Sequence, residues 1–344
     1  MKIFRSIAIA GILSSLVFSC APKEKQEEEV KNEKRDSLIE KINSPELKAV
    51  NDALLKEPDN DSLYRERSKL YIRFQIFEEA IGDANRAIKI DSTKAKNYLT
   101  LADAYFASNK TRQAKETLEK TVKRFPKDTE ALLKLGELFF LVRQYENAIT
   151  QINAALKIDE NLAHAYYLKG SVFKEMGDTT KAISSMQTAI EQDNRFYDAF
   201  VSIGVLYASR KNPLAFEYYE NALRIRPDDE TVLYNKAKLF QDLNKIQEAE
   251  AIYEKLLAAN KNNDKVLYNL GAISLDKKKD AKKAVDYFSK AIAANPKYTE
   301  AYYARGISFE TLKDLNNAKA DYNMCLKITP NYEPAVEALN ALQK

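Results

Sequence analysis

Apolar residues along this chain follow the spacing of paired helices. Between residues 129 and 162 they stand at Leu132, Leu135 and Phe139, and again at Ala148 and Ile152. Intervals of three and four place side chains on one face of a helix, whereas a strand would alternate every second residue. The polar residues 143–147 lie between the two groups. This segment therefore predicts two amphipathic helices joined by a short turn.

The same pattern recurs along most of the chain. An alanine marks each copy at intervals of 33 to 35 residues: Ala80, Ala114, Ala148, Ala182, Ala215, Ala249, Ala284 and Ala318. About twelve residues earlier stands a small residue: Ser68, Ala102, Gly136, Gly170, Gly204, Ala237, Gly271 and Gly306. Because a glycine inside a helix costs about 1 kcal/mol against alanine, its recurrence at one register predicts a close helix crossing. A fixed period of this length predicts a stacked array of helix pairs.

The copies resemble the tetratricopeptide repeat family. In the last copy, the family's aromatic, small and proline positions are occupied by Tyr302, Gly306, Phe309, Ala318, Tyr322 and Pro330. The resemblance covers residues 61–332 in eight copies. It implies an all-α fold, a right-handed superhelical solenoid of about eight helix–turn–helix repeats.

The flanking segments complete the expected domain organisation. Residues 45–60 predict an N-terminal capping helix and residues 333–344 a C-terminal capping helix, which would shield the end repeats. Residues 20–44 are charged and poor in apolar side chains, so we expect a flexible tether. The fifth copy lacks one residue near Lys211, and the seventh has one more in the Lys277–Lys279 turn.

Residues 1–19 predict a signal peptide, because Lys2 and Arg5 precede an apolar run that is too short for a stable membrane span. The run ends in Leu-Val-Phe-Ser before Cys20, which resembles the lipobox of bacterial lipoproteins. That resemblance implies a Cys20 carrying acyl chains such as palmitate and anchoring the protein in the cell envelope. Ala21 favours the outer membrane, facing the periplasm, and the acidic run 27–29 leaves the cell surface open. The alternative is an ordinary signal peptide with a chance cysteine.

The composition offers little for catalysis or metal binding. His164 is the single histidine, so no histidine cluster can bind zinc. No phosphate-binding loop or nucleophile-elbow motif occurs. Cys325 occupies a small-residue position, where we expect a core side chain. We therefore expect no enzyme activity, no cofactor and no metal.

The charge of the chain argues against nucleic acid as a partner. The formal net charge is +4, and a nucleic-acid site would need a clustered basic face. The densest basic patch, Lys277–Lys279 with Lys282 and Lys283, is interpreted as a solvated turn.

Candidate partner-binding residues follow from the family resemblance. In the family, the first helix of each repeat lines the concave face, and the residue after its leading aromatic points into it. Those residues are Arg65, Leu99, Leu133, Tyr167, Val201, Tyr234, Tyr268 and Tyr303. A tyrosine ring with a polar tip suits partner recognition. Asn235 and Asn269 follow two of the tyrosines, and their amides can pair with a peptide backbone.

We therefore predict that the partner contacts Tyr167, Tyr234, Asn235, Tyr268, Asn269 and Tyr303. The alternative is that Tyr-Asn at these places is family consensus without a binding role. The carboxylate clamp of chaperone-binding repeats does not match, because Arg65 and Lys69 are followed by Thr100, Glu130 and Lys134.

These features predict a protein–protein interaction scaffold or adaptor for a cell-envelope assembly, such as secretion, pilus or cell-wall machinery. Its partner would be a protein or extended peptide in the concave groove, with the membrane contacted through acylated Cys20. The alternative is a glycan- or peptidoglycan-associated binding protein, in which the tyrosines stack on sugars.

Overall fold

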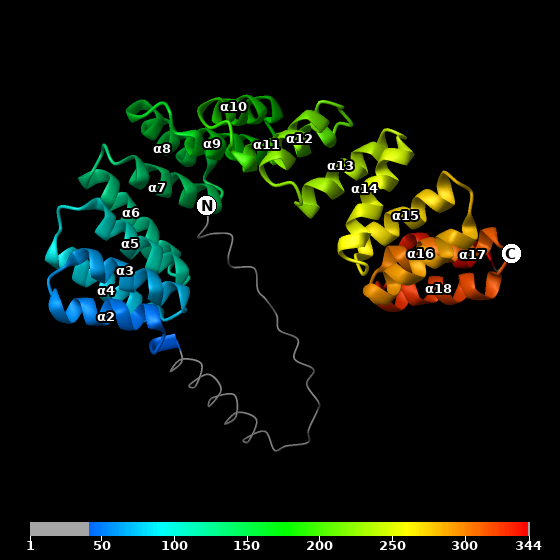
Figure 1. Ribbon diagram of the computed structural model, residues 1–344, viewed down its shortest axis with the longest axis horizontal. Helices are drawn as coiled ribbons and strands as arrows, with labels where there is room; N and C mark the ends of the chain where they lie inside the picture. Colours follow the sequence, from blue (N-terminus) through cyan, green and yellow to red (C-terminus); the bar gives the residue numbers. More distant parts are fainter. Residues whose placement is uncertain (1–40, 343–344) are drawn as a thin grey trace, which may run out of the picture. The chain divides into compact units, whose positions relative to one another are not determined.

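The computed structural model describes residues 41–342, and this part of the chain is helical apart from turns and loops (Figure 1). Within it there are eighteen helices and no strand. They are α2 (Pro45–Lys56), α3 (Asp61–Arg73), α4 (Phe77–Ile90), α5 (Ala95–Ala107), α6 (Thr111–Arg124), α7 (Thr129–Leu141), α8 (Tyr145–Ile158), α9 (Ala163–Glu175), α10 (Thr179–Gln192), α11 (Tyr197–Ala208), α12 (Ala215–Ile225), α13 (Glu230–Asp242), α14 (Ile246–Ala259), α15 (Asp264–Asp276), α16 (Ala281–Ala294), α17 (Thr299–Thr311), α18 (Leu315–Ile328) and α19 (Glu333–Ala341). The prediction of an all-α repeat solenoid is confirmed. The predicted signal peptide and Cys20 lie outside the described residues.

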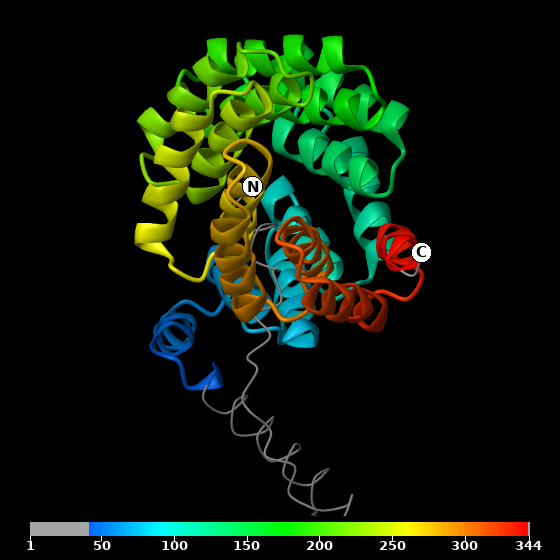
Figure 2. The same ribbon diagram turned by 90° about the vertical axis from the view of Figure 1, so that its right-hand side faces the viewer.

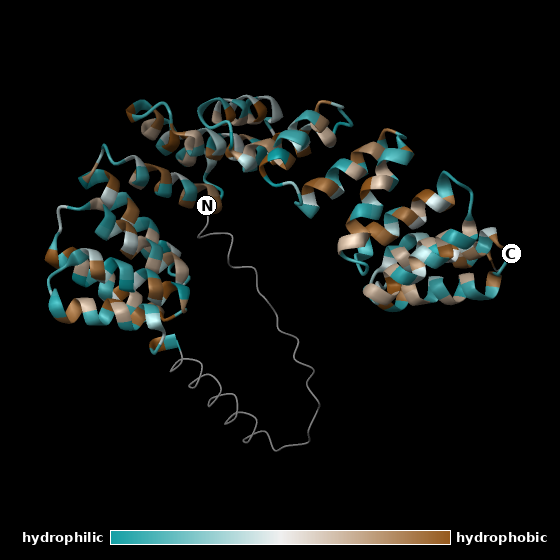
Figure 3. Ribbon diagram, in the orientation of Figure 1, coloured by the Kyte–Doolittle hydropathy of each residue, from teal (hydrophilic) through white to brown (hydrophobic). Residues whose placement is uncertain are grey.

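The described chain forms two compact units, one ending at Leu135 and the other beginning at Gly136. The first unit holds α2 to α6 and the start of α7, and the second holds the remaining helices. The repeat pattern predicted one array for all repeats, without this division. Within each unit, successive helices pack side by side (Figures 1 and 2). Hydrophilic and hydrophobic segments alternate along them, as in amphipathic helices (Figure 3).

Where the small residue of the first helix is a glycine, it makes room for a larger side chain of the second helix. A Cβ atom added at Gly271 would lie 2.6 Å from Cε1 of Phe288, and one at Gly306 would lie 2.5 Å from Cε1 of Tyr322. Both rings are fully buried. The recurrent glycines therefore allow the close helix crossing that the sequence predicts.

Each of the eight turns between the two helices of a repeat contains one residue in the left-handed conformation. These residues are Gln75, Asn109, Arg143, Gly177, Lys211, Asn244, Lys279 and Lys313. In most turns the next amide donates to the carbonyl five residues back, as in Asp314 N to Phe309 O at 2.8 Å. In the seventh repeat the extra residue enlarges the turn that this hydrogen bond closes. Asp280 N therefore donates to Ser274 O, six residues back, at 2.8 Å.

The first repeat and the last repeat each have an ion pair between their own two helices. The Arg67 guanidinium donates to both carboxylate oxygens of Asp83 at 2.7 and 2.8 Å. Arg305 and Asp321 make the same pair at 2.8 and 2.7 Å. The capping helices α2 and α19 pack beside these repeats. Cys325 is fully buried, and its thiol donates to the Thr299 carbonyl at 3.4 Å.

Candidate functional site

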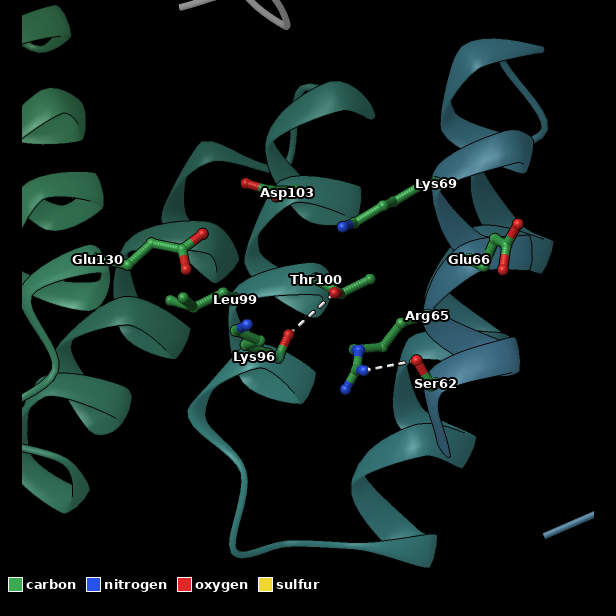
Figure 4. Close-up of a pocket in the computed structure, with 9 residues that line it drawn as sticks. All are labelled: Ser62, Arg65, Glu66, Lys69, Lys96, Leu99, Thr100, Asp103 and Glu130. Atoms are coloured by element: carbon green, nitrogen blue, oxygen red, sulfur yellow. Dashed lines mark hydrogen bonds between the residues drawn. The ribbon is translucent and has the colours of Figure 1, made fainter. Parts of the chain in front are cut away.

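A pocket of about 400 Å³ opens between the first helices of the first unit (Figure 4). Helices α3 and α5 contribute most of its lining, and the start of α7 adds Glu130. The lining residues are Ser62, Arg65, Glu66, Lys69, Lys96, Leu99, Thr100, Asp103 and Glu130. These nine residues are called the first-unit pocket below. Arg65 and Leu99 belong to the series that the sequence predicted on the partner-binding face.

Four charged side chains of the first-unit pocket have no ion-pair partner among the described residues. Two are cations, Lys69 and Lys96, and two are anions, Glu66 and Glu130, and all four are exposed. Asp103, by contrast, is paired with Lys134 at 2.7 Å. The pocket thus presents uncompensated charge of both signs.

Arg65 is held in a fixed position at the pocket wall. Its Nη1 donates to Asp61 Oδ2 and to Asn97 Oδ1, both at 2.9 Å, and its Nη2 donates to Ser62 Oγ at 2.9 Å. Burial disfavours ionised Asp61, but hydrogen bonds from Lys94 and Asn97 and the charge of Arg65 outweigh it and lower its pKa. Asp61 is therefore an anion at neutral pH that orients Arg65.

The predicted partner-binding tyrosines of the second unit are half-buried and pack against other rings in tilted or edge-on arrangements. Tyr167 packs on Phe196 with centroids 5.2 Å apart, and Tyr268 packs on Tyr298 at the same distance. Tyr303 packs on Tyr322 and Tyr332, at 5.6 and 5.7 Å. Burial raises the pKa of both Tyr268 and Tyr303.

The two predicted asparagines differ in their surroundings. Asn269 is only 7% exposed, and its Nδ2 donates to Oη of Tyr234 at 3.0 Å. Tyr234 and Asn269 are therefore brought together, but their polar groups satisfy each other. Asn235 is half-buried, and its amide makes no hydrogen bond to any described residue. Of the two, only Asn235 keeps both polar atoms of its amide free for a ligand.

The remaining candidate chemistry is sparse in the described part of the chain. Nε2 of His164 lies 2.7 Å from Oε1 of Glu137 in the second unit. Within residues 41–342, no three His, Cys, Asp or Glu side chains gather as metal ligands. No helix in that range is both long and apolar enough to cross a bilayer.

Sequence reasoning did not identify the first-unit pocket as a site. The signal was present, since Arg65, Lys69, Thr100 and Glu130 stand on consecutive first helices. Because these residues do not match the carboxylate clamp, they fall outside the predicted partner-binding set. What the sequence could not show is which charges are neutralised by neighbours and which remain free.

Comparison with known proteins places the repeats in a family. The tetratricopeptide repeat pattern matches residues 99–163 and 234–298 in one form, and residues 163–196 and 299–332 in another. Serine/threonine-protein phosphatase 5 of Rattus norvegicus is 34% identical over 127 residues, which are 36% of this chain and 26% of the phosphatase. The chain thus spans about a quarter of the length of that curated relative, and the match covers its repeat region only.

Solved structures show the same fold. The C-terminal part of a repeat protein from Cytophaga hutchinsonii gives a TM-score of 0.59 at 20% identity, covering 69% of this chain and 98% of that one. PilF of Pseudomonas aeruginosa gives a TM-score of 0.50 at 18% identity, covering 62% of this chain and 97% of that one.

Proposed function

Because this chain belongs to the tetratricopeptide repeat family, we propose that it is a lipid-anchored scaffold that binds a partner protein in its first-unit pocket. Repeats of this family act as protein-interaction scaffolds and are generally not catalytic. The observation that carries the proposal is the set of four unpaired charges in an open pocket on the first helices.

The chemistry of the pocket defines the partner segment. Lys69 and Lys96 offer ammonium groups to a carboxylate, while Glu66 and Glu130 offer carboxylates to a lysine or arginine. A segment with charges of both signs would satisfy all four, and complementary charge favours both the rate and the specificity of association. The fixed Arg65 guanidinium adds a rigid donor at the wall. The partner is therefore an exposed, extended peptide segment that alternates acidic and basic residues.

The partner is proposed to meet the scaffold in the cell envelope. The support for this is the motif that ends at Cys20, whose acyl chains would hold the protein at a membrane. Cell fractionation tests it: Cys20→Ala is expected to move the protein from the membrane pellet to the soluble fraction. A variant that stays in the pellet to the same extent as the parent would contradict the anchor.

Charge reversal tests the pocket. Chemical cross-linking in the native cell, followed by mass spectrometry, identifies the captured protein. Lys69→Glu combined with Lys96→Glu is expected to weaken capture at least about tenfold, a loss of about 1.4 kcal/mol. Lys120→Glu combined with Lys123→Glu is the matched control, because both lysines are exposed on α6, outside the pocket. Equal capture by the double variant and the control would refute the assignment.

A further inference from the structure

The turns within the repeats of the second unit carry long basic side chains in a backbone conformation that favours glycine. Arg143, Lys211, Lys279 and Lys313 have φ values of 60°, 52°, 56° and 66°. A side chain with a Cβ is disfavoured there, because the Cβ crowds the following carbonyl. Of the eight corresponding positions, one is a glycine, Gly177, and two are asparagines, Asn109 and Asn244, which also tolerate this conformation. Strained residues of this kind tend to occur at functional sites.

These four cations are free in the structure. All are exposed, and none makes an ion pair or a side-chain hydrogen bond to another described residue. In the same turn as Lys279, Lys278 does pair with Glu250 at 2.7 Å. The basic patch around Lys277–Lys279 was expected to be only a solvated turn. Its Lys279 is instead one member of a series of free cations that continues through other repeats.

Exposed apolar side chains stand beside three of these cations, Arg143, Lys211 and Lys313, and beside Gly177. Of the large apolar residues that are exposed in the described chain, six lie in or next to these turns of the second unit: Leu141, Val142, Met176, Leu214, Leu312 and Leu315. Leu141 is 52% exposed and Leu214 is 48% exposed. Isolated surface leucines are ordinary, but exposed apolar side chains next to a free cation in three turns of one kind are not.

Two of the four cations, Lys211 and Lys279, lie in turns that share one side of the second unit. Figure 1 shows the α11–α12, α13–α14 and α15–α16 turns along one edge, with the loops that join successive repeats on the opposite edge. The side of the second unit formed by its turns within repeats is called the turn edge below.

We infer that the turn edge rests on an anionic lipid surface. Long basic side chains reach headgroups, and short apolar ones enter the boundary between headgroup and acyl chain. Such contacts need no concave site, which agrees with single residues projecting from turn tips. The inference goes beyond partner capture in the pocket. It takes from the proposed function only the expectation that the chain is held at a bilayer, and that expectation favours a lipid over an acidic protein.

Vesicle binding tests the turn edge directly. All variants are full chains carrying Cys20→Ala, so that acyl chains are absent and residues 1–19 contribute equally. The test variant replaces Arg143, Lys211, Lys279 and Lys313 by asparagine, which tolerates the left-handed conformation. The control replaces four exposed basic residues at the opposite edge by asparagine: Arg195, Lys261, Lys265 and Lys297. Both variants lose the same formal charge.

Co-sedimentation is measured with vesicles of phosphatidylcholine containing phosphatidylglycerol, and with phosphatidylcholine alone. The test variant is expected to bind the anionic vesicles at least about tenfold more weakly than its parent, since each surface cation contributes on the order of a fivefold effect. The control should stay within about twofold. Equal losses in both variants, no loss in either, or equal parental binding to both vesicle types would overturn the inference.

A fluorescence measurement checks insertion independently of affinity. The chain has no tryptophan, so Leu214→Trp is a unique reporter at the turn edge. Its emission should shift to the blue on anionic vesicles, whereas Ile158→Trp, at the opposite edge, should not shift. If the test variant keeps its vesicle binding and instead loses a cross-linked protein, the turn edge serves a protein and the inference is wrong. Loss of capture by the Lys69 and Lys96 variants would still support the pocket.

Discussion

A methyl group added at Gly306 is expected to destabilise the last repeat, although alanine is the better helix former. Its Cβ would lie 2.5 Å from Cε1 and 2.9 Å from Cδ1 of Tyr322, whereas carbon atoms pack best at about 3.5–4.0 Å. Tyr322 is fully buried, and its hydroxyl donates to Glu310 Oε1 at 3.0 Å. The ring cannot retreat by about 1 Å without disturbing that bond.

The magnitude follows from two opposing effects. Inserting a methyl group into a packed core costs about 1–3 kcal/mol. Replacing glycine by alanine inside a helix gains about 1 kcal/mol. We expect a net loss of about 1 kcal/mol for Gly306→Ala. Gly82→Ala is the matched control, because a Cβ at Gly82 in α4 meets nothing within 4 Å. It should stabilise by about 1 kcal/mol, so the two substitutions differ by about 2 kcal/mol.

Urea unfolding followed by far-ultraviolet circular dichroism measures the change, and amide hydrogen exchange assigns it to a repeat. A second substitution tests the cause. The second repeat pairs Ala102 with Leu118 in the same register, so Gly306→Ala should become neutral or stabilising when Tyr322→Leu is present. The reasoning fails if Gly306→Ala stabilises the chain as much as Gly82→Ala does, or if Tyr322→Leu leaves its effect unchanged.

Three further predictions concern electrostatics and backbone strain. Arg305→Met leaves the buried Asp321 carboxylate unpaired and should lower the free energy of unfolding by about 3 kcal/mol. Urea denaturation measures this loss. The double variant Arg305→Met, Asp321→Leu is the control and should lose less stability, because it leaves no unpaired charge. Lys279→Gly should raise the melting temperature, gaining about 0.5–1 kcal/mol, because glycine relieves the left-handed strain; a lower melting temperature would contradict it. Hydrogen bonds from the Thr93 hydroxyl and amide lower the pKa of Asp91 to about 2. Its stabilising effect is therefore complete above about pH 4 and is lost as the pH falls toward 2. Asp91→Asn should flatten that part of the curve of stability against pH.

The repeat period is enough to predict most of the fold. Fixed spacing of Ala80 to Ala318 and of the small residues predicts the helix pairs, since each must bury one apolar face against the next. The added residue near Lys279 and the missing one near Lys211 also fall in turns. The division between Leu135 and Gly136 was not predictable, because no change of pattern marks it inside the third repeat.

The candidate site was predictable only in part. The position of Arg65 and Leu99 within the repeat, just after the leading aromatic residue, was enough to predict that both lie on the partner-binding face. Both line the first-unit pocket. Register could not show that Asn269 would be covered and bonded to Tyr234, because that depends on how far two adjacent helices approach. Nor could it show that Lys134 neutralises Asp103 while Lys69 stays free. Pairing across repeats is a property of three-dimensional distances, and a single sequence does not contain them.

Photo-cross-linking from inside the pocket tests the central claim most directly. A photoreactive amino acid placed at position 96, in the first-unit pocket, is irradiated in the native cell, and the adduct is identified by mass spectrometry. Position 120 on α6 and position 268 in the tyrosine series serve as comparisons. The account predicts one specific protein adduct from position 96 and none from position 120. An adduct from position 268 alone, or equal labelling from positions 96 and 120, would contradict it.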